Sequence, residues 1–401
     1  MEINKVWKSY SIQLLFALYL LVAIVASLQD LLHAQKAYLP NGLFYFEYNN
    51  YIIFKNSYFH LIEGKDLYRL FPAEQWDLYK YSPAFSLFFS LFAYFPDYIG
   101  LVLWSLLNAL LVFFAILQLP AFSPQKKSWM LLFCAIELLG SIQNAQSNGL
   151  MAGLIIMAFA LMEQKRYGWA AFCIVFSVYI KIFGAAAFAL CLLYPSKTRM
   201  ATYIIFWMLF LAIIPALAAG FSQLGILYQH WFRLLQDDHM VSQGLSLVGV
   251  LNAWFRVNVS KNEVAIAGIL IFCIPLLRWK YYSIYSFRLL MLSSVLLWTI
   301  VFNHKAESPT FIISMCGIAI WYFAKSRTRG DRFLLLLSFV LTTLSVSDLC
   351  PRFVREEFIR PYRIKALMSV VIWIKVVIEL MFEKFSAGDF QPKMSTDIEL
   401  R

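Results

Sequence analysis

Carboxylate, amide and aromatic side chains that could take part in acid–base chemistry are concentrated in residues 44–83 of an otherwise apolar chain. Glu47, Asp66 and Asp77 are its candidate general bases, because an ionised carboxylate can accept a proton from a substrate hydroxyl. A surface carboxylate is more often solvated than catalytic. Taken alone, this stretch therefore favours an interfacial lid, and only its context can favour an active site.

A second polar segment, residues 143–149, contains four amide side chains within six residues. Amides at the end of a helix can cap it and satisfy backbone groups. Four of them exceed what a cap needs, and amides are also the usual hydrogen-bonding partners of sugar hydroxyls. The segment indicates either helix capping or a sugar site, with Gln146 and Asn148 as the binding residues.

Two basic features could bind a phosphate. Lys181 is isolated in the apolar sequence SVYIKIFGAAAF, where a lysine either snorkels to the interface or binds an anion. The segment 352–363 carries the arginines Arg352, Arg355, Arg360 and Arg363. A lipid-linked phosphate would explain these arginines, because Arg binds phosphate through paired hydrogen bonds. An error in the topology given below would explain them too.

His304 and Glu307 lie three residues apart in residues 303–309 and would share one helical face if a helix begins there. Two ligands alone are weak support for a metal site. A hydrogen-bonded His–Glu pair that positions a reacting group is the more economical interpretation. A helix start with Pro309 in its first turn explains the same residues without chemistry. No pattern in the sequence requires a cofactor, and none supports a divalent metal.

The elements that must position these side chains are membrane helices. Apolar residues make up 61% of the 401 residues and charged residues 14%, with a mean hydropathy of +0.67. Soluble domains carry roughly 25% charged residues. The sequence predicts an all-α polytopic membrane protein. The six Cys residues show no paired spacing, which argues against a disulfide framework or a zinc site. The net charge of +11 needs no nucleic-acid partner, because cytoplasmic loops carry excess Lys and Arg.

The basic residues also predict the topology. Five basic clusters, near residues 126, 165, 197, 278 and 325, separate alternate apolar runs and belong in the cytoplasm by the positive-inside rule. This gives about twelve crossings with both termini cytoplasmic. The short run 84–95 must then re-enter or pack in the bundle, since at ~1.5 Å per residue it cannot cross the ~30 Å hydrocarbon. Residues 1–382 form one transmembrane domain, and 383–401 form a disordered cytoplasmic tail.

This topology places the polar segments together on the outer face. They are the first loop 29–82, residues 143–149, the Lys181 corner, and residues 221–260, 303–308 and 347–363. Apolar positions in the first loop recur at helical spacing, which predicts an amphipathic helix over 50–63 that lies flat at the membrane surface and stops at Gly64. Any chemistry is therefore expected at the outer face.

Taken together, these segments resemble the GT-C superfamily of membrane glycosyltransferases, and most closely glycosyltransferase family 87, the polyprenol-phosphate-mannose-dependent mannosyltransferases. The resemblance covers roughly residues 10–325. It rests on the stretch from Asn50-Tyr51 to Gly64-Lys65-Asp66-Leu67-Tyr68, on Tyr81-Ser82-Pro83, on Pro96, Leu103-Trp104 and Asn108, on Gln146-Ser147-Asn148, on Lys181 and on His304.

The resemblance implies a GT-C-like bundle that moves a hexose, mannose by family name, from a polyprenyl-phosphate donor to a glycan or glycolipid acceptor, with inversion. Tyr51, Tyr68 and Tyr81 would then contact substrate. The lipid carrier would meet Lys181 and the arginine segment, including Arg352 and Arg355, with its tail in the bilayer.

One departure affects the mechanism. The catalytic Asp of the family falls on Asn50, and an amide cannot act as a general base. We expect Glu47, supported by His304, to take this role, while Asp66 and the His304–Glu307 pair stay open. A transporter or flippase, or a non-catalytic assembly subunit, are the alternatives. Transporters place ionisable groups at mid-membrane and show internal repeats, and neither feature is evident here.

Overall fold

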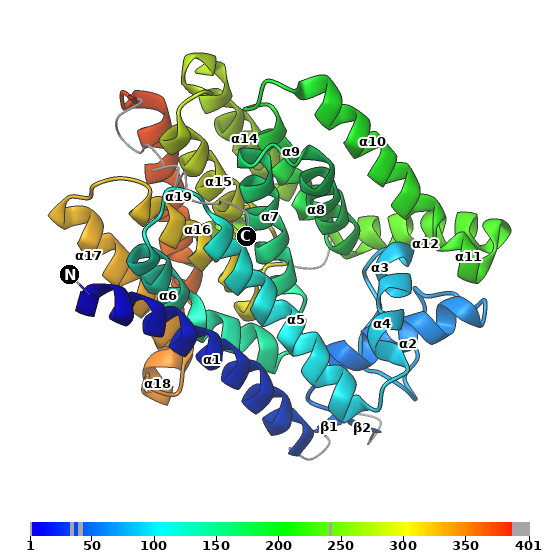
Figure 1. Cartoon of the computed structure of the whole chain (residues 1–401). Helices are drawn as coiled ribbons and strands as arrows, with labels where there is room; N and C mark the ends of the chain where they lie inside the picture. Colours follow the sequence, from blue (N-terminus) through cyan, green and yellow to red (C-terminus); the bar gives the residue numbers. More distant parts are fainter. Residues whose placement is uncertain (1, 33–35, 39–42, 240–242, 387–401) are drawn as a thin grey trace.

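The computed structural model describes residues 2–32, 36–38, 43–239 and 243–386, which form a bundle of helices with one short hairpin. The predicted all-α bundle is confirmed. Figure 1 shows α1 lying across α5 and α6 at one side, with α10 and α12 at the other. The hairpin pairs β1 (Lys36–Tyr38) with β2 (Leu43–Tyr45) in antiparallel register, with Lys36 opposite Tyr45.

The helices of the first half are α1 (Glu2–Leu32), α2 (Asn49–Ile62), α3 (Pro83–Phe88), α4 (Ser90–Ala93), α5 (Asp97–Gln118), α6 (Pro124–Gln143), α7 (Asn148–Glu163), α8 (Tyr167–Ile180), η1 (Ile182–Ala187), α9 (Phe188–Cys191) and α10 (Lys197–Ile213). Those of the second half are α11 (Ala216–Ala219), α12 (Phe221–His239), α13 (Leu247–Phe255), α14 (Lys261–Cys273), η2 (Ile274–Leu277), η3 (Trp279–Tyr281), α15 (Tyr285–Val301), η4 (Ser308–Thr310), α16 (Phe311–Phe323), α17 (Arg329–Ser338), η5 (Phe339–Thr343), η6 (Leu344–Val346), α18 (Arg352–Val354), η7 (Arg355–Ile359) and α19 (Ile364–Phe382).

Several of these helices suit a bilayer by length and composition. Among the described residues, Ser11–Leu32, Asp97–Gln118 and Lys197–Ala219 are long and apolar enough to cross a membrane. Shorter apolar helices include Asn148–Glu163, Tyr167–Ile180 and Tyr285–Val301. The count of twelve crossings stays a prediction. The run 84–95 forms the short helices α3 and α4, neither of which could span a bilayer.

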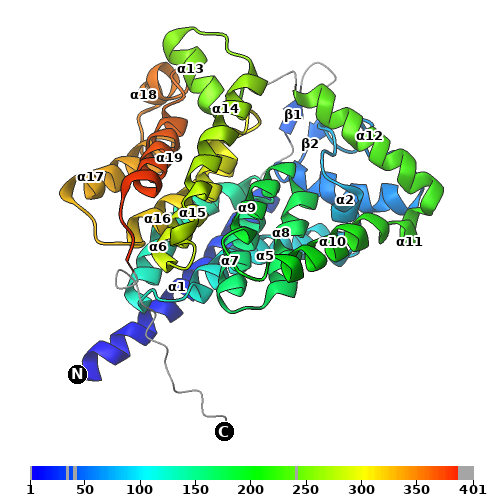
Figure 2. The same ribbon diagram turned by 90° about the horizontal axis from the view of Figure 1, so that it is seen from above.

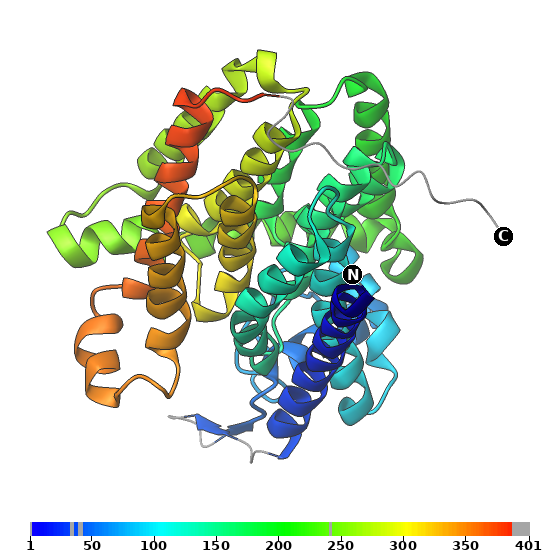
Figure 3. The same ribbon diagram turned by 60° about the vertical axis from the view of Figure 1, so that its left-hand side comes forward.

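The centre of the bundle is formed by α7, α15 and α16, whose side chains are buried around most of each helix, as expected for helices that are apolar on every face. The close approach of α7 to α5 depends on a glycine. A Cβ at Gly153 of α7 would lie 2.7 Å from Leu111 of α5, closer than real Cβ atoms approach a neighbour. Figure 3 shows the C-terminal helices, in orange and red, on the opposite side of this centre from α1, in blue.

The basic segments gather at one end of the bundle. A cavity there is lined by Lys165, Lys197 and Arg288, and Arg288 forms a two-pronged ion pair with Glu163. Lys126 donates to the carbonyl of Phe323, and Arg278 donates to carbonyls at Leu380 and Glu383. The five predicted cytoplasmic clusters therefore share one end, although their side of the membrane remains a prediction. Residues 387–401, most of the predicted tail, lie outside the described residues.

The first polar loop folds around α2, which begins and ends within one residue of the predicted helix and is followed by Gly64 in the left-handed region at φ 68°. The amphipathic pattern was wrong in one respect. His60, expected on a polar face, is buried against Phe71 and bonds Glu74 at 2.9 Å. The helix is therefore packed on several sides within the protein.

The helix α12 lies beside this loop, as Figure 2 shows. His230 bonds Asp66 at 2.8 Å, Gln223 donates to the carbonyl of Gly64, and Trp231 donates to the carbonyl of Lys80. These contacts tie a segment far along the chain to the first polar loop.

Candidate functional site

The polar segments at the other end meet around a cavity of about 190 Å³, which we call the amide cavity. Most of its polar lining comes from four of the predicted outer segments: Asn50, Asp77, Lys80, Tyr81, Gln146, Lys181, Asn303, Lys305 and Glu307. Trp231 and Leu235 of α12 also line it. Pockets for drug-sized ligands measure ~300–1,000 Å³, so this cavity suits a single sugar ring rather than an oligosaccharide.

Lys181 reaches the amide cavity because the chain turns sharply after α8. Its backbone is extended, and Gly184 then packs so close to α8 that a Cβ would lie 2.7 Å from the Ser177 carbonyl carbon. The Lys181 ammonium donates to Asn148 Oδ1 at 2.7 Å. Burial lowers the pKa of Lys181 to about 8, and the nearby Glu307 carboxylate opposes this shift. The group is thus a cation at neutral pH that titrates slightly above it.

The amide segment is held by a strained turn between α6 and α7. Ala145 adopts the left-handed region at φ 48°, which costs roughly 1 kcal/mol for a residue with a Cβ, and the indole of Trp104 donates to its carbonyl at 3.0 Å. This turn brings Gln146 to the cavity wall and buries Asn148 behind Lys181. Within the described part of the chain, Asn148 Nδ2 has no hydrogen-bond partner. Asn148 therefore acts on the cavity through Lys181.

Tyr81 is fixed by the start of α3. Ser82 caps that helix, accepting from the Phe85 amide, and its hydroxyl donates to the carbonyl of Tyr179 at 2.6 Å. The phenol of Tyr81 accepts from Ser147 at 3.3 Å, and Lys181 lies 5.8 Å from the centre of its ring. Burial raises the pKa of Tyr81, so its phenol stays protonated. Tyr68, in the layer behind, donates to the Tyr81 carbonyl.

Two carboxylates line the amide cavity. Asp77 accepts from the Leu78 amide at 2.7 Å and from Lys80 at 3.1 Å. The Glu307 carboxylate is exposed and accepts no hydrogen bond from the described residues. The Glu307 oxygens are therefore free to meet a substrate hydroxyl, whereas those of Asp77 already accept hydrogen bonds within the protein. Glu307 is therefore the stronger candidate base.

The helix that would place His304 and Glu307 on one face begins only at Ser308. Residues 303–307 form a turn and not the start of a helix, because Asn303 Oδ1 accepts from the Lys305 amide and the Ala306 carbonyl accepts from Leu245. His304 packs near Phe183 and does not line the amide cavity, while Asn303 and Glu307 do.

Other residues expected at the site lie outside the amide cavity. Asp66 is bound by His230 and by the Tyr68 amide, and Tyr51 is buried against Gly100 and Phe89. Glu47 follows β2 and does not line the cavity. Asn50 does line it, but its amide donates to the carbonyl of Asn144 at 2.9 Å.

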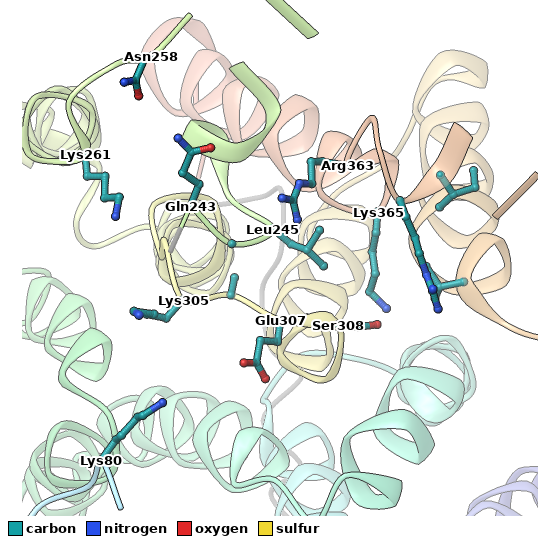
Figure 4. A pocket seen from close by; sticks show the side chains of 15 residues that line it. Lys80, Gln243, Leu245, Asn258, Lys261, Lys305, Glu307, Ser308, Arg363 and Lys365 are labelled. Atoms are coloured by element: carbon teal, nitrogen blue, oxygen red, sulfur yellow. The ribbon is translucent and has the colours of Figure 1, made fainter. Parts of the chain in front are cut away.

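A second, larger cavity of about 1000 Å³ adjoins the first and shares Lys80, Lys305 and Glu307 with it. We call it the basic cavity. Figure 4 shows Glu307 near its middle, with Lys80 on one side and Arg363 and Lys365 on the other. Arg360 and Arg363 of the predicted arginine segment line it, but Arg352 and Arg355 do not. Arg355 instead donates to Asp348 and to the carbonyl of Ser347.

The sequence gives several of the lining residues little weight. Asp77 is a candidate base of the first loop but not the preferred one, while Asn303 and Arg363 stand in segments whose other residues give the stronger signal. Trp231 has no distinguishing signal beyond its place in a polar outer segment. Among the described residues, no group of three or more His, Cys, Asp or Glu side chains is arranged to hold a metal ion.

Comparison with known proteins identifies the family. The model of glycosyltransferase family 87 matches residues 79–350, which is more than half of the chain. The chain belongs to glycosyltransferase family 87. This membership confirms the resemblance drawn from the sequence and makes the chain a membrane glycosyltransferase. The family match includes Tyr81, Gln146, Lys181 and Glu307 and excludes Asn50.

The other comparisons add little to the family 87 assignment. No curated protein matches the chain. Among solved structures, the crystal structure of ArnT from Cupriavidus metallidurans bound to undecaprenyl phosphate is similar over 92% of this chain and 77% of its own, at 12% identity and a TM-score of 0.38. A likeness this loose carries no argument about the site.

Proposed function

We propose that the chain transfers a hexose from a polyprenyl-phosphate donor to an acceptor hydroxyl at the outer membrane face, with inversion at the anomeric carbon. The observation that carries the proposal is the meeting of Lys181, Glu307 and the amides of Gln146 and Asn303 at one cavity. A cation, an unbonded carboxylate and sugar-binding amides are what such a transfer needs. Mannose is the sugar that the family name suggests.

In this proposal the donor hexose occupies the amide cavity. Gln146 and Asn303 bond its hydroxyls, and Tyr81 and Trp231 supply aromatic surface at the cavity wall. The donor phosphate lies beside Lys181, whose charge opposes the negative charge that grows as the phosphate leaves. The polyprenyl tail extends into the bilayer, where its apolar burial anchors the donor.

Glu307 acts as the base because it lies where the amide and basic cavities meet. The acceptor hydroxyl approaches from the basic cavity and gives its proton to the Glu307 carboxylate. Its oxygen forms the new bond to the anomeric carbon, while the bond from that carbon to the phosphate oxygen breaks and the phosphate takes the electron pair. Loss of an acid at Asn50 is therefore compatible with activity, since Glu307 supplies a carboxylate to the same cavity.

Transfer can be tested with the purified full chain in nanodiscs, using polyprenyl phosphates that carry labelled mannose, glucose or galactose and a membrane lipid extract as acceptor. We expect label in an acceptor with one of these donors, and none with Lys181→Gln. If no donor is used by the wild type, the chain is not this transferase. In a parallel assay with the chain in closed liposomes, label that moves across the bilayer on an unchanged donor would favour a flippase.

A further inference from the structure

The basic cavity has a charge pattern that the transfer step itself does not require. Six basic side chains line it against one carboxylate, Glu307, among the described residues that form its wall. They are Lys80, Lys261, Lys305, Arg360, Arg363 and Lys365. They come from the first loop, α14, the turn 303–307 and the segment that joins η7 to the start of α19, so no single charged helix face explains them.

Several of these cations are already paired within the protein. Lys365 is buried and bonds both oxygens of Glu137 at 2.9 Å, Arg360 bonds Glu356 at 2.9 Å, and Lys80 bonds Asp77. The Lys365–Glu137 pair joins α19 to α6 and fixes the start of α19 at the cavity. These pairs shape the wall and offset the charges of the three cations that they involve.

Arg363 is different. Its guanidinium makes no hydrogen bond or ion pair to any described residue, and in Figure 4 it points toward the middle of the cavity. Its backbone lies in the left-handed region at φ 53°, a conformation that costs non-glycine residues roughly 1 kcal/mol. The fold therefore holds a half-buried, unpaired guanidinium over the cavity at a cost in backbone energy, as is common where strain serves a binding site.

We infer that the basic cavity binds an acceptor that carries an anionic group, a phosphate or a phosphodiester, and that Arg363 is the residue that recognises it. This rests on the proposed function, because it gives the cavity beside Glu307 to the acceptor. Arginine presents paired N–H donors that match phosphate oxygens, and the surrounding lysines raise the local anion concentration. At about 1000 Å³ the cavity holds a headgroup together with the sugar that bears the reacting hydroxyl.

The site can be tested by isothermal titration of the full chain in nanodiscs of zwitterionic phosphatidylcholine. The probes are dihexanoyl phosphatidylglycerol, dihexanoyl phosphatidylcholine and inorganic phosphate. We expect the anionic lipid to bind at least tenfold more tightly than the zwitterionic one, and the binding to weaken as salt is added. Inorganic phosphate that binds as well as the anionic lipid would mean that the anion alone is recognised. Weaker phosphate binding would mean that the lipid portion contributes.

Variants assign the binding to Arg363. Arg363→Gln should weaken the binding of the anionic lipid at least tenfold, and Arg363→Lys should recover part of this loss. Both substitutions face the same backbone strain, so the difference between them reports the charge. Arg352→Gln, exposed in the same outer segment but outside the cavity, is the matched control. Equal binding of both lipids, or unchanged binding in Arg363→Gln with an unchanged melting temperature, would overturn the inference.

Failure of the inference and of the proposed function can be told apart. Lys181→Gln should abolish sugar transfer without changing anionic lipid binding. In transfer assays, dihexanoyl phosphatidylglycerol should raise the KM for acceptor and leave the KM for donor unchanged. Anionic binding without any transfer would refute the transferase. Transfer that the anionic lipid fails to inhibit, or inhibits by competing with the donor, would refute the acceptor site alone.

Discussion

The Lys181 ammonium lies 2.7 Å from Asn148 Oδ1, at the wall of the cavity that also contains Glu307. This contact joins two segments that stand out in the sequence for different reasons, an isolated lysine and an amide-rich turn. It gives the cation a fixed position and leaves its charge uncompensated by hydrogen bonding to a carboxylate. The main functional predictions follow from that arrangement.

Activity should fall at high pH because Lys181 loses its proton. Burial lowers the folded-state pKa to about 8, so the cation is fully present below pH 7 and is lost as the pH rises through 8. The kcat/KM for donor should be level below this value and drop about tenfold per pH unit above it. Lys181→Arg is charged at every accessible pH. This variant should retain some activity, and its kcat/KM should no longer fall above pH 8. If kcat/KM of Lys181→Arg still falls above pH 8, the fall comes from the titration of another group.

Asn148→Asp should move the fall of kcat/KM to higher pH. A carboxylate 2.7 Å from the ammonium favours its charged form and raises the pKa of Lys181. The midpoint of the kcat/KM profile should rise by about one unit or more, and the donor KM should increase because the new carboxylate repels the phosphate. Gln143→Glu, in the same segment but outside the cavity lining, provides the control for added charge. A midpoint that stays at 8 would show that Asn148 does not govern the lysine.

Removal of the amides should weaken substrate binding more than chemistry. Gln146→Ala and Asn303→Ala each delete one hydrogen-bonding group from the cavity wall, a loss of about 0.5–1.5 kcal/mol, which is roughly a two- to thirteenfold increase in KM. The product of the two single effects should describe the double variant if the residues contact different hydroxyls. Steady-state kinetics on a defined donor give these values. If KM is unchanged in both variants, the donor sugar does not bind in this cavity.

The buried Glu137–Lys365 pair makes a prediction about stability. Removing one partner strands a buried charge, so Lys365→Met should destabilise the protein by about 3–5 kcal/mol. The double variant Glu137→Leu with Lys365→Met should recover most of this loss, because no charge is left unpaired. Denaturation in detergent gives the free energies of unfolding of the wild type, the two single variants and the double variant, which together form a double-mutant cycle. Additive losses in the double variant would mean that the pair contributes little through its charge.

The sequence predicts the helical bundle, the ends where charged and polar segments gather, and the helix α2 well, because these follow from hydropathy, from the bias of basic residues and from helical spacing. It also names Gln146, Lys181 and Glu307 as candidates, because each belongs to a polar interruption between apolar runs, and the structure places all three at one cavity. These are signals that a single segment carries.

The sequence does not predict which side of each segment faces the other segments, and the rest of the site depends on this. Arg352 and Arg363 are alike as residues, but only Arg363 itself adopts the left-handed backbone conformation and lines a cavity. Asp66 and Asp77 are similar carboxylates of one loop, and it is α12, more than a hundred and fifty residues away, that binds the first through His230. No local pattern in the sequence contains that information.

The identity of the base is the central claim, and one comparison tests it most directly. Transfer of labelled sugar from the preferred polyprenyl-phosphate donor should be measured for the wild type, Glu307→Gln and Glu47→Gln, each shown by its melting temperature to be folded. We expect Glu307→Gln to turn over roughly a hundredfold to ten-thousandfold more slowly, as is typical for loss of a general base, and Glu47→Gln to match the wild type closely. Near-normal turnover in folded Glu307→Gln, with activity lost in Glu47→Gln, would contradict this assignment.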